Sequence, residues 1–313
     1  MKILIIGCNG YQGYVVGVAE RLKSMLAELE MTLVLVRDPL HKVEVLSKRT
    51  PYTTKILLNR DSVVELLVRT YREMDKYSLF ILGCPRLYPL IHSIFRISRK
   101  VMMVLIESGY NFTIPYISYY IPDPVILQWP EQRMLYSRGV VVGPIYESPL
   151  YNVSKGDLLS FIVSYRNYRL LEVISCKDVY RVLEDIGKPV FIGYDRGVYV
   201  SKIGVRNVID AYSIDLDSVI SRSRVVVTDD PYLAIYSSLS YGKSVVLAKE
   251  FIDGYEYINA RTLAKKLNIE YVCVDKGSVD AIIRAIYNSL KKSVKSYGNG
   301  GAVLAKKLID ILL

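Results

Sequence analysis

The sequence predicts an α/β protein made of two doubly wound, Rossmann-like domains. Short runs of Val, Ile and Leu alternate with helical patterns along the chain, which is typical of βαβ units and parallel sheets. The runs contain few polar residues, as expected for strands covered by helices on both faces. A chain of 313 residues, 51% hydrophobic and 23% charged, has the length and composition of a two-domain globular protein.

The first series of apolar runs ends in a stretch rich in turn-forming residues. Gly143-Pro144 opens this stretch, and further Pro, Ser and Gly residues follow it. We therefore expect a first domain over residues 1–147 and a linker over residues 148–157. The expected strands of the first domain are Lys2–Ile6, Thr32–Val36, Leu79–Leu82, Val101–Ile106, Val125–Leu127 and Val140–Val142.

A second series of the same kind predicts a second domain over residues 158–297. Residues 298–313 are expected to form a C-terminal helix, starting at Ala302, that packs back on the first domain. The expected strands of the second domain are Leu158–Val163, Pro189–Ile192, Asn207–Ile209, Val225–Thr228, Val245–Ala248 and Tyr271–Val274. Its expected helices are Tyr168–Asp185, Pro231–Tyr241, Glu256–Leu267 and Val279–Lys292.

The net charge of +10, from 41 basic and 31 acidic residues, favours anionic partners. Divided at Glu147, the chain carries 18 − 13 = +5 in its first part and 23 − 18 = +5 in its second. Because no basic arm or tail stands out, no nucleic-acid partner is expected. The charge fits either a solvated basic surface or attraction to phosphates and anionic lipids.

The four cysteines are far apart in the sequence. No CxxC spacing occurs among Cys8, Cys84, Cys176 and Cys273, so neither a zinc site nor a disulfide framework is predicted. This usage favours a reducing, cytoplasmic compartment. The longest uncharged stretch, Ser108–Pro122, contains glycine and proline and is too short for a membrane span. The 27 tyrosines beside three glutamines suggest a thermophilic source.

A glycine-rich loop follows the first expected strand. In Gly7-Cys8-Asn9-Gly10-Tyr11, the glycines permit a tight turn and let backbone amides approach a ligand at the start of a helix. The spacing is not GxGxxG, so no dinucleotide cofactor is expected. The loop is either part of a ligand site, lined by Gly7, Asn9, Gly10 and Tyr11, or a turn without a ligand.

Glu107 is the candidate for acid–base chemistry. It ends an otherwise apolar strand, at the carboxyl edge where open α/β sheets bind ligands. Burial there would raise the pKa of its carboxyl group toward that of a useful general base. The alternative is a carboxylate paired with an arginine for structural reasons. His41 and His92 are isolated in the sequence and are expected to be structural.

Residues 127–144 carry the most distinctive motifs of the chain. They read Leu-Gln-Trp-Pro-Glu at 127–131 and Tyr-Ser-Arg-Gly-Val-Val-Val-Gly-Pro at 136–144. With the strand that ends in Glu107-Ser108, they resemble the membrane-associated subunit of the eukaryotic transferase that adds the second GlcNAc to dolichyl-diphosphate-GlcNAc. That subunit has a similar Glu-Ser, Gln-Trp-Pro and Val-Gly-Pro.

The second half is similar to the partner subunit of that enzyme and, more distantly, to the bacterial transferase that completes lipid II. The similarity lies in Phe-Ile-Val-Ser at 161–164, the apolar run at 225–228, Tyr-Gly-Lys-Ser at 241–244 and Asp-Gly-Tyr-Glu at 253–256. The chain thus looks like a fusion of both subunits. The resemblance implies a GT-B glycosyltransferase with two Rossmann-like domains facing a cleft.

The resemblance also implies a donor site in the second domain. Arg166 stands where the family has a phosphate loop, and Glu256 replaces a glutamine that reaches sugar hydroxyls. An exposed loop arginine and a helix-capping glutamate are the alternatives. The implied donor-binding residues are Arg166, Asn167, Thr228, Asp229, Glu256 and Asn259.

Three positions depart from the family pattern. Tyr11 replaces a histidine of the first loop, and Ser237 aligns with a glutamate that holds the ribose. Asp229-Asp230 replaces part of a His-Ala-Gly turn before the nucleotide-binding helix. Two carboxylates there cap a helix well but would repel a diphosphate.

The activity implied by the resemblance is transfer of a sugar, GlcNAc in the family, from a UDP-sugar to a polyprenyl-diphosphate-linked acceptor. Glu107 would be the base of an inverting reaction that needs neither a metal nor a cofactor besides the nucleotide-sugar. The protein would act at the cytoplasmic membrane face, held peripherally on anionic lipid by Leu87–Lys100 and Pro115–Ile121.

Two other functions are left open by the sequence. The departures at Tyr11, Asp229-Asp230 and Ser237 favour a GT-B relic that binds a sugar nucleotide or a partner glycosyltransferase without turnover. A sugar-nucleotide 2-epimerase would share the architecture, although the Gln-Trp-Pro segment speaks against it.

Overall fold

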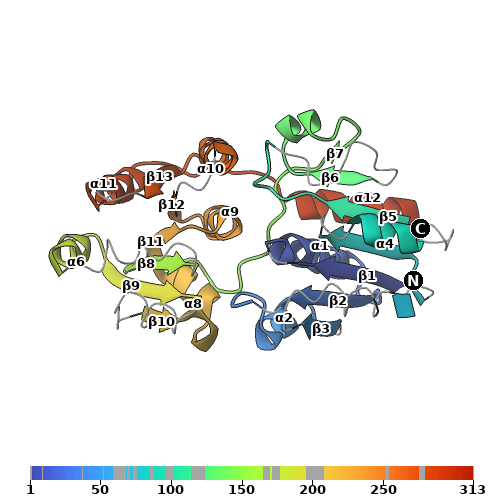
Figure 1. Ribbon diagram of the computed structural model, residues 1–313. Helices are drawn as coiled ribbons and strands as arrows, with labels where there is room; N and C mark the ends of the chain where they lie inside the picture. The colour runs from blue at the N-terminus through green and yellow to red at the C-terminus, as the bar shows by residue number, and fades with distance from the viewer. Residues whose placement is uncertain are drawn as a thin grey trace. The chain divides into compact units, whose positions relative to one another are not determined.

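The computed structural model consists of two compact units (Figure 1). One unit comprises Met1–Ser148 together with Tyr297–Leu313, and the other comprises Pro149–Ser296. Each unit is an open parallel sheet with helices, so the predicted α/β class with two doubly wound domains is confirmed. The residues described are 2–8, 10–36, 38–51, 53–58, 68, 71–72, 76–84, 88–95, 102–113, 124–164, 170, 177–194, 208–250, 254–274 and 279–312.

The first unit contains a seven-stranded sheet in the order β3-β2-β1-β4-β5-β6-β7, with all neighbouring strands parallel. Its central strands are buried on both faces, as their continuous apolar runs predict. The strands are β1 (Lys2–Gly7), β2 (Glu30–Val36), β3 (Thr54–Leu58), β4 (Leu79–Gly83), β5 (Met102–Ile106), β6 (Val125–Leu127) and β7 (Val140–Val141).

Strand β3 is absent from the predicted strands. Lys55 interrupts its short apolar run, and most of its side chains are only partly buried because β3 forms the edge of the sheet. The flanking helices are α1 (Gln12–Met25), α2 (Val43–Arg49) and α4 (Tyr88–Phe95), and a 3-10 helix, η3 (Pro130–Met134), follows β6. Across the described residues, no helix is long and apolar enough to cross a membrane.

The last helix, α12 (Gly300–Leu312), completes the first unit by packing against α1. It begins two residues before the predicted start, within the glycine run, and Gly300 approaches another segment closely. The Gly300 amide donates a 2.8 Å hydrogen bond to the Pro144 carbonyl oxygen, and a Cβ at this position would overlap the Gly143 carbonyl group. The glycine run therefore serves packing as well as the turn.

The second unit contains a six-stranded parallel sheet in the order β10-β9-β8-β11-β12-β13. Its strands are β8 (Leu158–Val163), β9 (Lys188–Gly193), β10 (Val208–Asp210), β11 (Ser223–Thr228), β12 (Ser244–Glu250) and β13 (Glu270–Val274). Its helices are α6 (Lys177–Glu184), α8 (Leu216–Arg222), α9 (Pro231–Leu239), α10 (Gly254–Leu267) and α11 (Val279–Ser289), with the 3-10 turn η5 (Ala211–Ser213).

Three of the predicted helices of this unit match α9, α10 and α11. The fourth, predicted over 168–185, lies partly outside the described residues, and its described part contains α6. Helix α8 was not predicted because it has only seven residues, which is too short for a clear apolar period. The Asp215 side chain, which accepts a hydrogen bond from the Ser218 amide, marks its start.

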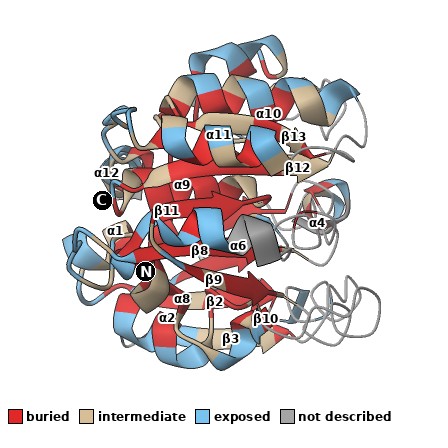
Figure 2. Ribbon diagram, turned by 90° about the vertical axis from the view of Figure 1, so that its left-hand side faces the viewer, coloured by how far each residue is buried: buried red, intermediate tan, exposed pale blue. Residues whose placement is uncertain are grey.

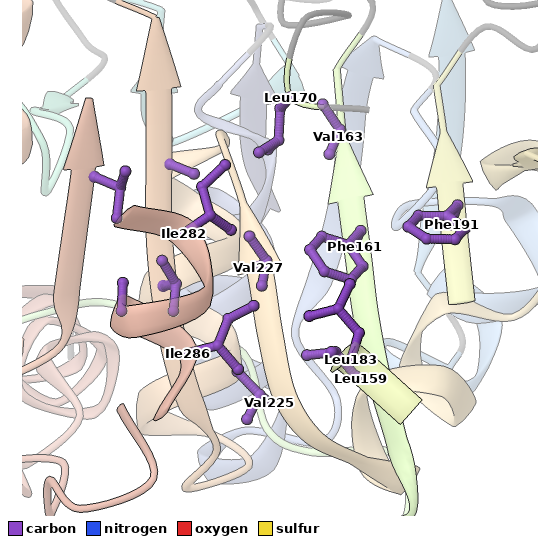
Figure 3. Close-up of a cluster of buried hydrophobic side chains, with 14 of the residues drawn as sticks. Leu159, Phe161, Val163, Leu170, Leu183, Phe191, Val225, Val227, Ile282 and Ile286 are labelled. Carbon is purple, nitrogen blue, oxygen red and sulfur yellow. The ribbon is translucent and has the colours of Figure 1, made fainter. Parts of the chain in front are cut away.

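One face of this sheet forms a continuous apolar core with α11 (Figure 3). Alternate residues of β8, such as Leu159 and Phe161, meet alternate residues of β11, while Ile282 and Ile286 lie one helical turn apart on α11. Figure 2 shows the same pattern, with buried strands and helices whose outer sides are exposed. Apolar side chains at alternate strand positions thus pack against apolar side chains one turn apart on the helix, in one core.

A network of buried charged groups links Glu147, near the end of the Met1–Ser148 segment, to helices α1 and α2. The His41 ring contacts Asp38 through Nδ1 and Glu147 through Nε2, both at 2.7 Å. Arg49 pairs with Glu147 and Glu20 at 2.7 and 2.8 Å. Burial disfavours the charged form of His41, but the two carboxylates outweigh it and raise its pKa to about 10. His41 is therefore an imidazolium that holds Glu147 in place.

Replacing His41 with Gln should destabilise the protein in a pH-dependent way. The folded state keeps the His41 proton up to about pH 10, whereas the unfolded chain loses it near pH 6.5. The stabilisation is therefore complete below pH 6.5 and is lost as the pH rises to about 10. Breaking a buried ion pair costs about 3–5 kcal/mol, and the loss here should lie at or below the lower end because Arg49 still pairs with Glu147.

Denaturant melts of wild type and His41→Gln across this pH range would measure the difference. The exposed Lys2–Glu30 pair offers a control, and Lys2→Gln should change stability little at any pH. A His41→Gln effect that is the same at pH 6 and at about pH 10 would contradict the imidazolium assignment.

Candidate functional site

The first unit has its switch in strand order between β1 and β4. Open α/β sheets bind ligands at the carboxyl ends of the strands beside such a point. Gly7 pairs with Gly83 at the ends of β1 and β4, and Leu82 pairs with Leu105 of the next strand, β5. This register brings the loop after β1, the residue after β4 and Glu107 after β5 to the same edge of the sheet.

The Glu107 side chain is fully buried and surrounded by hydrogen-bond donors. Its Oε1 accepts from the Tyr11 hydroxyl at 3.0 Å and from the Ser108 amide at 2.8 Å. Its Oε2 accepts from the Tyr136 hydroxyl at 2.6 Å, and the Asn111 side chain donates as well. Burial raises the pKa of Glu107, and these donors oppose the rise. These partners are hydroxyl and amide groups, which differs from the arginine of the alternative structural interpretation.

Gln128, from the Gln-Trp-Pro motif, and Gln132, from η3, hold the backbone around this carboxylate. The Gln128 amide donates to the Glu107 backbone oxygen at 2.9 Å and accepts from the Ile145 amide at 2.9 Å. Gln132 donates to the carbonyl oxygens of Ser108 and Asn111 at 2.7 and 2.8 Å. Both glutamines are fully buried, so each polar atom must be satisfied within the protein. The two glutamines thus fix Glu107 and the loop that follows it.

The same motif places an aromatic pair beside the loop. The Trp129 indole donates to the Gly109 carbonyl oxygen at 2.7 Å, and its ring meets the edge of Tyr297 with centroids 5.2 Å apart. Tyr136 was quoted in the sequence motif without a role. Its contact with Glu107 depends on the turn through η3, which the linear sequence does not reveal.

A disulfide between Cys8 and Cys84 contradicts the prediction of no disulfide framework, and it removes the reason for which the cysteine usage favoured a reducing compartment. The two residues are 76 positions apart in the sequence, but each directly follows a strand, and those strands are neighbours in the sheet. Sequence spacing alone could not show this proximity. Cys273 is in no disulfide, and Cys176 lies outside the described residues.

The predicted ligand loop follows Cys8 directly. Gly10 adopts φ +80°, which favours glycine, and the Tyr11 amide donates to the Cys8 carbonyl oxygen at 2.9 Å. Tyr11 is a partly exposed residue, and its hydroxyl donates to the buried Glu107. Of the other loop residues predicted, Gly7 is the last residue of β1, and Asn9 lies outside the described residues.

In the second unit, the strand order switches between β8 and β11. Asp229, just after β11, accepts a 2.8 Å hydrogen bond from the Ser164 amide and another from the Ser164 hydroxyl. Burial raises the pKa of Asp229 to about 6, and the Asp230 charge adds to the rise, while Ser164 and Lys249 oppose it. Ser164 was not among the predicted site residues.

Asp230 caps helix α9. Its Oδ1 accepts from the amides of Tyr232 and Leu233 at 2.8 and 3.2 Å. These first-turn amides are the groups that would hold a phosphate at a helix N-terminus. In this structure a carboxylate of the chain occupies them, as the sequence suggested for the Asp-Asp-Pro turn.

The remaining predicted donor residues are distributed over the same unit. Buried Thr228 accepts from the Asp230 amide at 3.1 Å. Glu256 and Asn259 lie on α10, with the Glu256 carboxylate 3.8 Å from the Lys249 ammonium group. The positive charge of Lys249 also lowers the pKa of Asp229, so Lys249 interacts electrostatically with both Asp229 and Glu256.

Arg166 and Asn167 lie outside the described residues. Ser237, which aligns with a ribose-binding glutamate in the resembling family, is fully buried in α9. Among the residues described, no group of three or more His, Cys, Asp and Glu side chains could hold a metal ion.

Comparison with known proteins identifies the fold. No protein-family model and no curated protein matches the chain. A solved UDP-N-acetylglucosamine 2-epimerase matches with a TM-score of 0.60 and 12% identity, covering 100% of this chain and 96% of its own. Arabidopsis thaliana UGT89C1, complexed with UDP, matches with a TM-score of 0.60 and 10% identity over 99% of both chains.

MurG of Acinetobacter baumannii matches with a TM-score of 0.53 and 11% identity, again over 99% of both chains. At these identities the likeness concerns the fold alone. It establishes a GT-B-type fold of two Rossmann-like domains, which glycosyltransferases share with 2-epimerases.

Proposed function

We propose that the chain is a glycosyltransferase that moves a sugar from a UDP-sugar to a hydroxyl group of a polyprenyl-diphosphate-linked acceptor. The observation that carries this proposal is the Tyr11–Glu107 pair at the switch point of the first sheet. A buried carboxylate with a raised pKa, joined by a hydrogen bond to the hydroxyl of a partly exposed tyrosine, is suited to accept a proton. GlcNAc is the sugar that the Gln-Trp-Pro resemblance favours.

The proposed reaction inverts the anomeric carbon. The acceptor oxygen bonds to that carbon from one side as the bond to the UDP oxygen breaks on the other. Because Glu107 is buried, the acceptor proton passes to the Tyr11 oxygen while Tyr11 gives its own proton to Glu107. The charge that develops on UDP is stabilised by fixed donors and cations, in a reaction that uses no metal.

UDP is proposed as the nucleotide because the resembling transferases use UDP-GlcNAc and UGT89C1, which shares the fold, was solved with UDP. The donor would bind at the carboxyl edge of the second sheet, near Thr228, Asp229 and the α10 residues Glu256 and Asn259. Arg166 and Asn167 are proposed to supply a cation and an amide. The Asp230 cap means that the diphosphate cannot use the first amides of α9.

That cap favours a second candidate function. A GT-B protein that binds a sugar nucleotide or a partner glycosyltransferase without turnover would have no need for a helix terminus open to phosphate. The 2-epimerase activity is the third candidate. Its support is the shared fold, and the Gln-Trp-Pro frame around Glu107 speaks against it.

Glu107→Gln should lower turnover by about 10²- to 10⁴-fold while donor binding persists, because the amide keeps the shape but cannot accept the proton. Tyr11→Phe should have a comparable effect if the proton passes through Tyr11. Tyr136→Phe is the matched control, since it removes the other phenol that donates to Glu107 but lies at the buried side of the carboxylate.

The assay is transfer from UDP-GlcNAc to a short-chain polyprenyl-diphosphate-GlcNAc, with a thermal melt of each variant. Full activity of Glu107→Gln would refute the base assignment. Equal losses in Tyr11→Phe and Tyr136→Phe would refute the path through Tyr11. A wild type that binds UDP-GlcNAc but transfers nothing would establish the second candidate.

Binding of UDP-GlcNAc should strengthen as the pH falls through about 6, the pKa of Asp229. Protonation of Asp229 removes a negative charge that repels the diphosphate, so affinity should rise by about tenfold. Asp229→Asn should bind more tightly at neutral pH and lose this pH dependence. Calorimetric titration of both proteins between about pH 5 and 8 measures the effect.

Asp157→Asn provides a control for that titration. Asp157 is an exposed carboxylate of the same unit, so its removal should leave the pH dependence unchanged. Binding that does not vary with pH in the wild type would refute the placement of the diphosphate near Asp229. The absence of any binding at millimolar UDP-GlcNAc would refute the donor assignment itself.

A lipid-linked acceptor also requires the protein to reach a membrane surface, which we propose it does peripherally at the cytoplasmic face. Of the two segments predicted to bind lipid, Pro115–Ile121 lies outside the described residues, while residues 88–95 of Leu87–Lys100 are described and form α4. With a net charge of +10, co-sedimentation should favour anionic over neutral vesicles and weaken with salt. Equal binding to both would refute the electrostatic contribution.

A further inference from the structure

The Cys8–Cys84 disulfide lies at the switch point of the first sheet, beside the Tyr11–Glu107 pair. Cys8 and Cys84 directly follow the paired residues Gly7 and Gly83. Both cysteines are buried, and the Cys8 amide donates to the Gly83 carbonyl oxygen at 3.1 Å. The covalent bond thus joins the start of the β1–α1 loop to the end of β4.

Tyr11 contacts the chain at both ends of the disulfide, next to Cys8 and next to Cys84. Its amide donates to the Cys8 carbonyl oxygen at 2.9 Å, which closes the turn on the β1 side. Its side chain crosses the end of β4, where a Cβ on Gly83 would lie 3.2 Å from the Tyr11 Cβ. The Tyr11 hydroxyl then donates a 3.0 Å hydrogen bond to Glu107, which directly follows β5, the strand next to β4.

We propose that the Cys8–Cys84 disulfide is a positioning bond for catalysis: it holds the Tyr11 hydroxyl against the Glu107 carboxylate, and its reduction lowers turnover. This inference rests on the proposed function. A dithiol reductant breaks the sulfur–sulfur bond by delivering two electrons and two protons to the cysteine sulfurs, and is itself converted to a disulfide. The two resulting thiols no longer restrain the loop, so the Tyr11–Glu107 hydrogen bond is lost from part of the population.

A double-mutant cycle tests whether the disulfide acts through Tyr11. The background carries Cys176→Ser and Cys273→Ser, so that the reductant, dithiothreitol, acts on one pair of cysteines. Oxidised and reduced forms are compared with Tyr11 intact and with Tyr11→Phe. Reduction should lower kcat by about tenfold when Tyr11 is present, the cost of a hydrogen bond to a charged group, and should leave kcat of Tyr11→Phe unchanged.

A second measurement does not depend on transfer activity. The pH titration of the Glu107 side-chain carboxyl is followed by ¹³C NMR, with its signal assigned by its loss in Glu107→Gln. Loss of the Tyr11 donor should raise the pKa of Glu107 on reduction when Tyr11 is present. Reduction of Tyr11→Phe should cause no further change. Thermal melts ensure that all forms are folded at the measuring temperature.

The outcomes separate this inference from the proposed function. If reducing the disulfide lowers kcat by the same factor with and without Tyr11, the bond only stabilises the fold, and the inference is overturned. An unchanged Glu107 titration on reduction would overturn it as well. If no form transfers sugar, the proposed function fails while the NMR titration still decides the positioning role. Should dithiothreitol leave the buried bond intact, Cys8→Ser/Cys84→Ser takes the place of the reduced form in the same cycle.

Discussion

The burial of the Glu107 carboxylate is the constraint on which the candidate site depends. An ionised group removed from water must be hydrogen-bonded, and the cost of leaving it without partners would exceed most single contributions to stability. Its donors come from segments far apart in the sequence: the β1–α1 loop, the residues just after β5 and the turn after η3. These segments must therefore fold together, and the Gln128 and Gln132 side chains hold the backbone between them.

In the second unit, polar groups at the carboxyl edge of the sheet are likewise hydrogen-bonded to carboxylates of the chain itself. The first amides of α9 bond to Asp230, and buried Asp229 bonds to Ser164. Both carboxylates stand at the start of a helix beside the switch point of the sheet, where open α/β proteins commonly bind anions. The local structure is thus satisfied without a ligand, which stabilises the free protein and makes any anionic ligand compete with groups already in place.

The regular parts of the fold could be predicted from the sequence because burial on both faces leaves a plain signal. Continuous apolar runs identified β1, β4 and β8, and Glu107 was found because a lone carboxylate ends such a run. Edge strand β3 and the short helix α8 carry weaker patterns and were not predicted. The Cys8–Cys84 bond and the contacts of Glu107 with Tyr11 and Tyr136 depend on strand register, which a single sequence does not reveal.

The packing of α12 against α1 has a consequence for synthesis on the ribosome. The first unit includes residues from both ends of the sequence, whereas the second is one continuous segment. Chains are made from the amino terminus, and domains generally fold as they emerge. Here the unit that contains Met1–Ser148 cannot be completed until α12 has been made. The continuous unit can reach its final structure earlier, so the order of completion is the reverse of the order in which the two units begin.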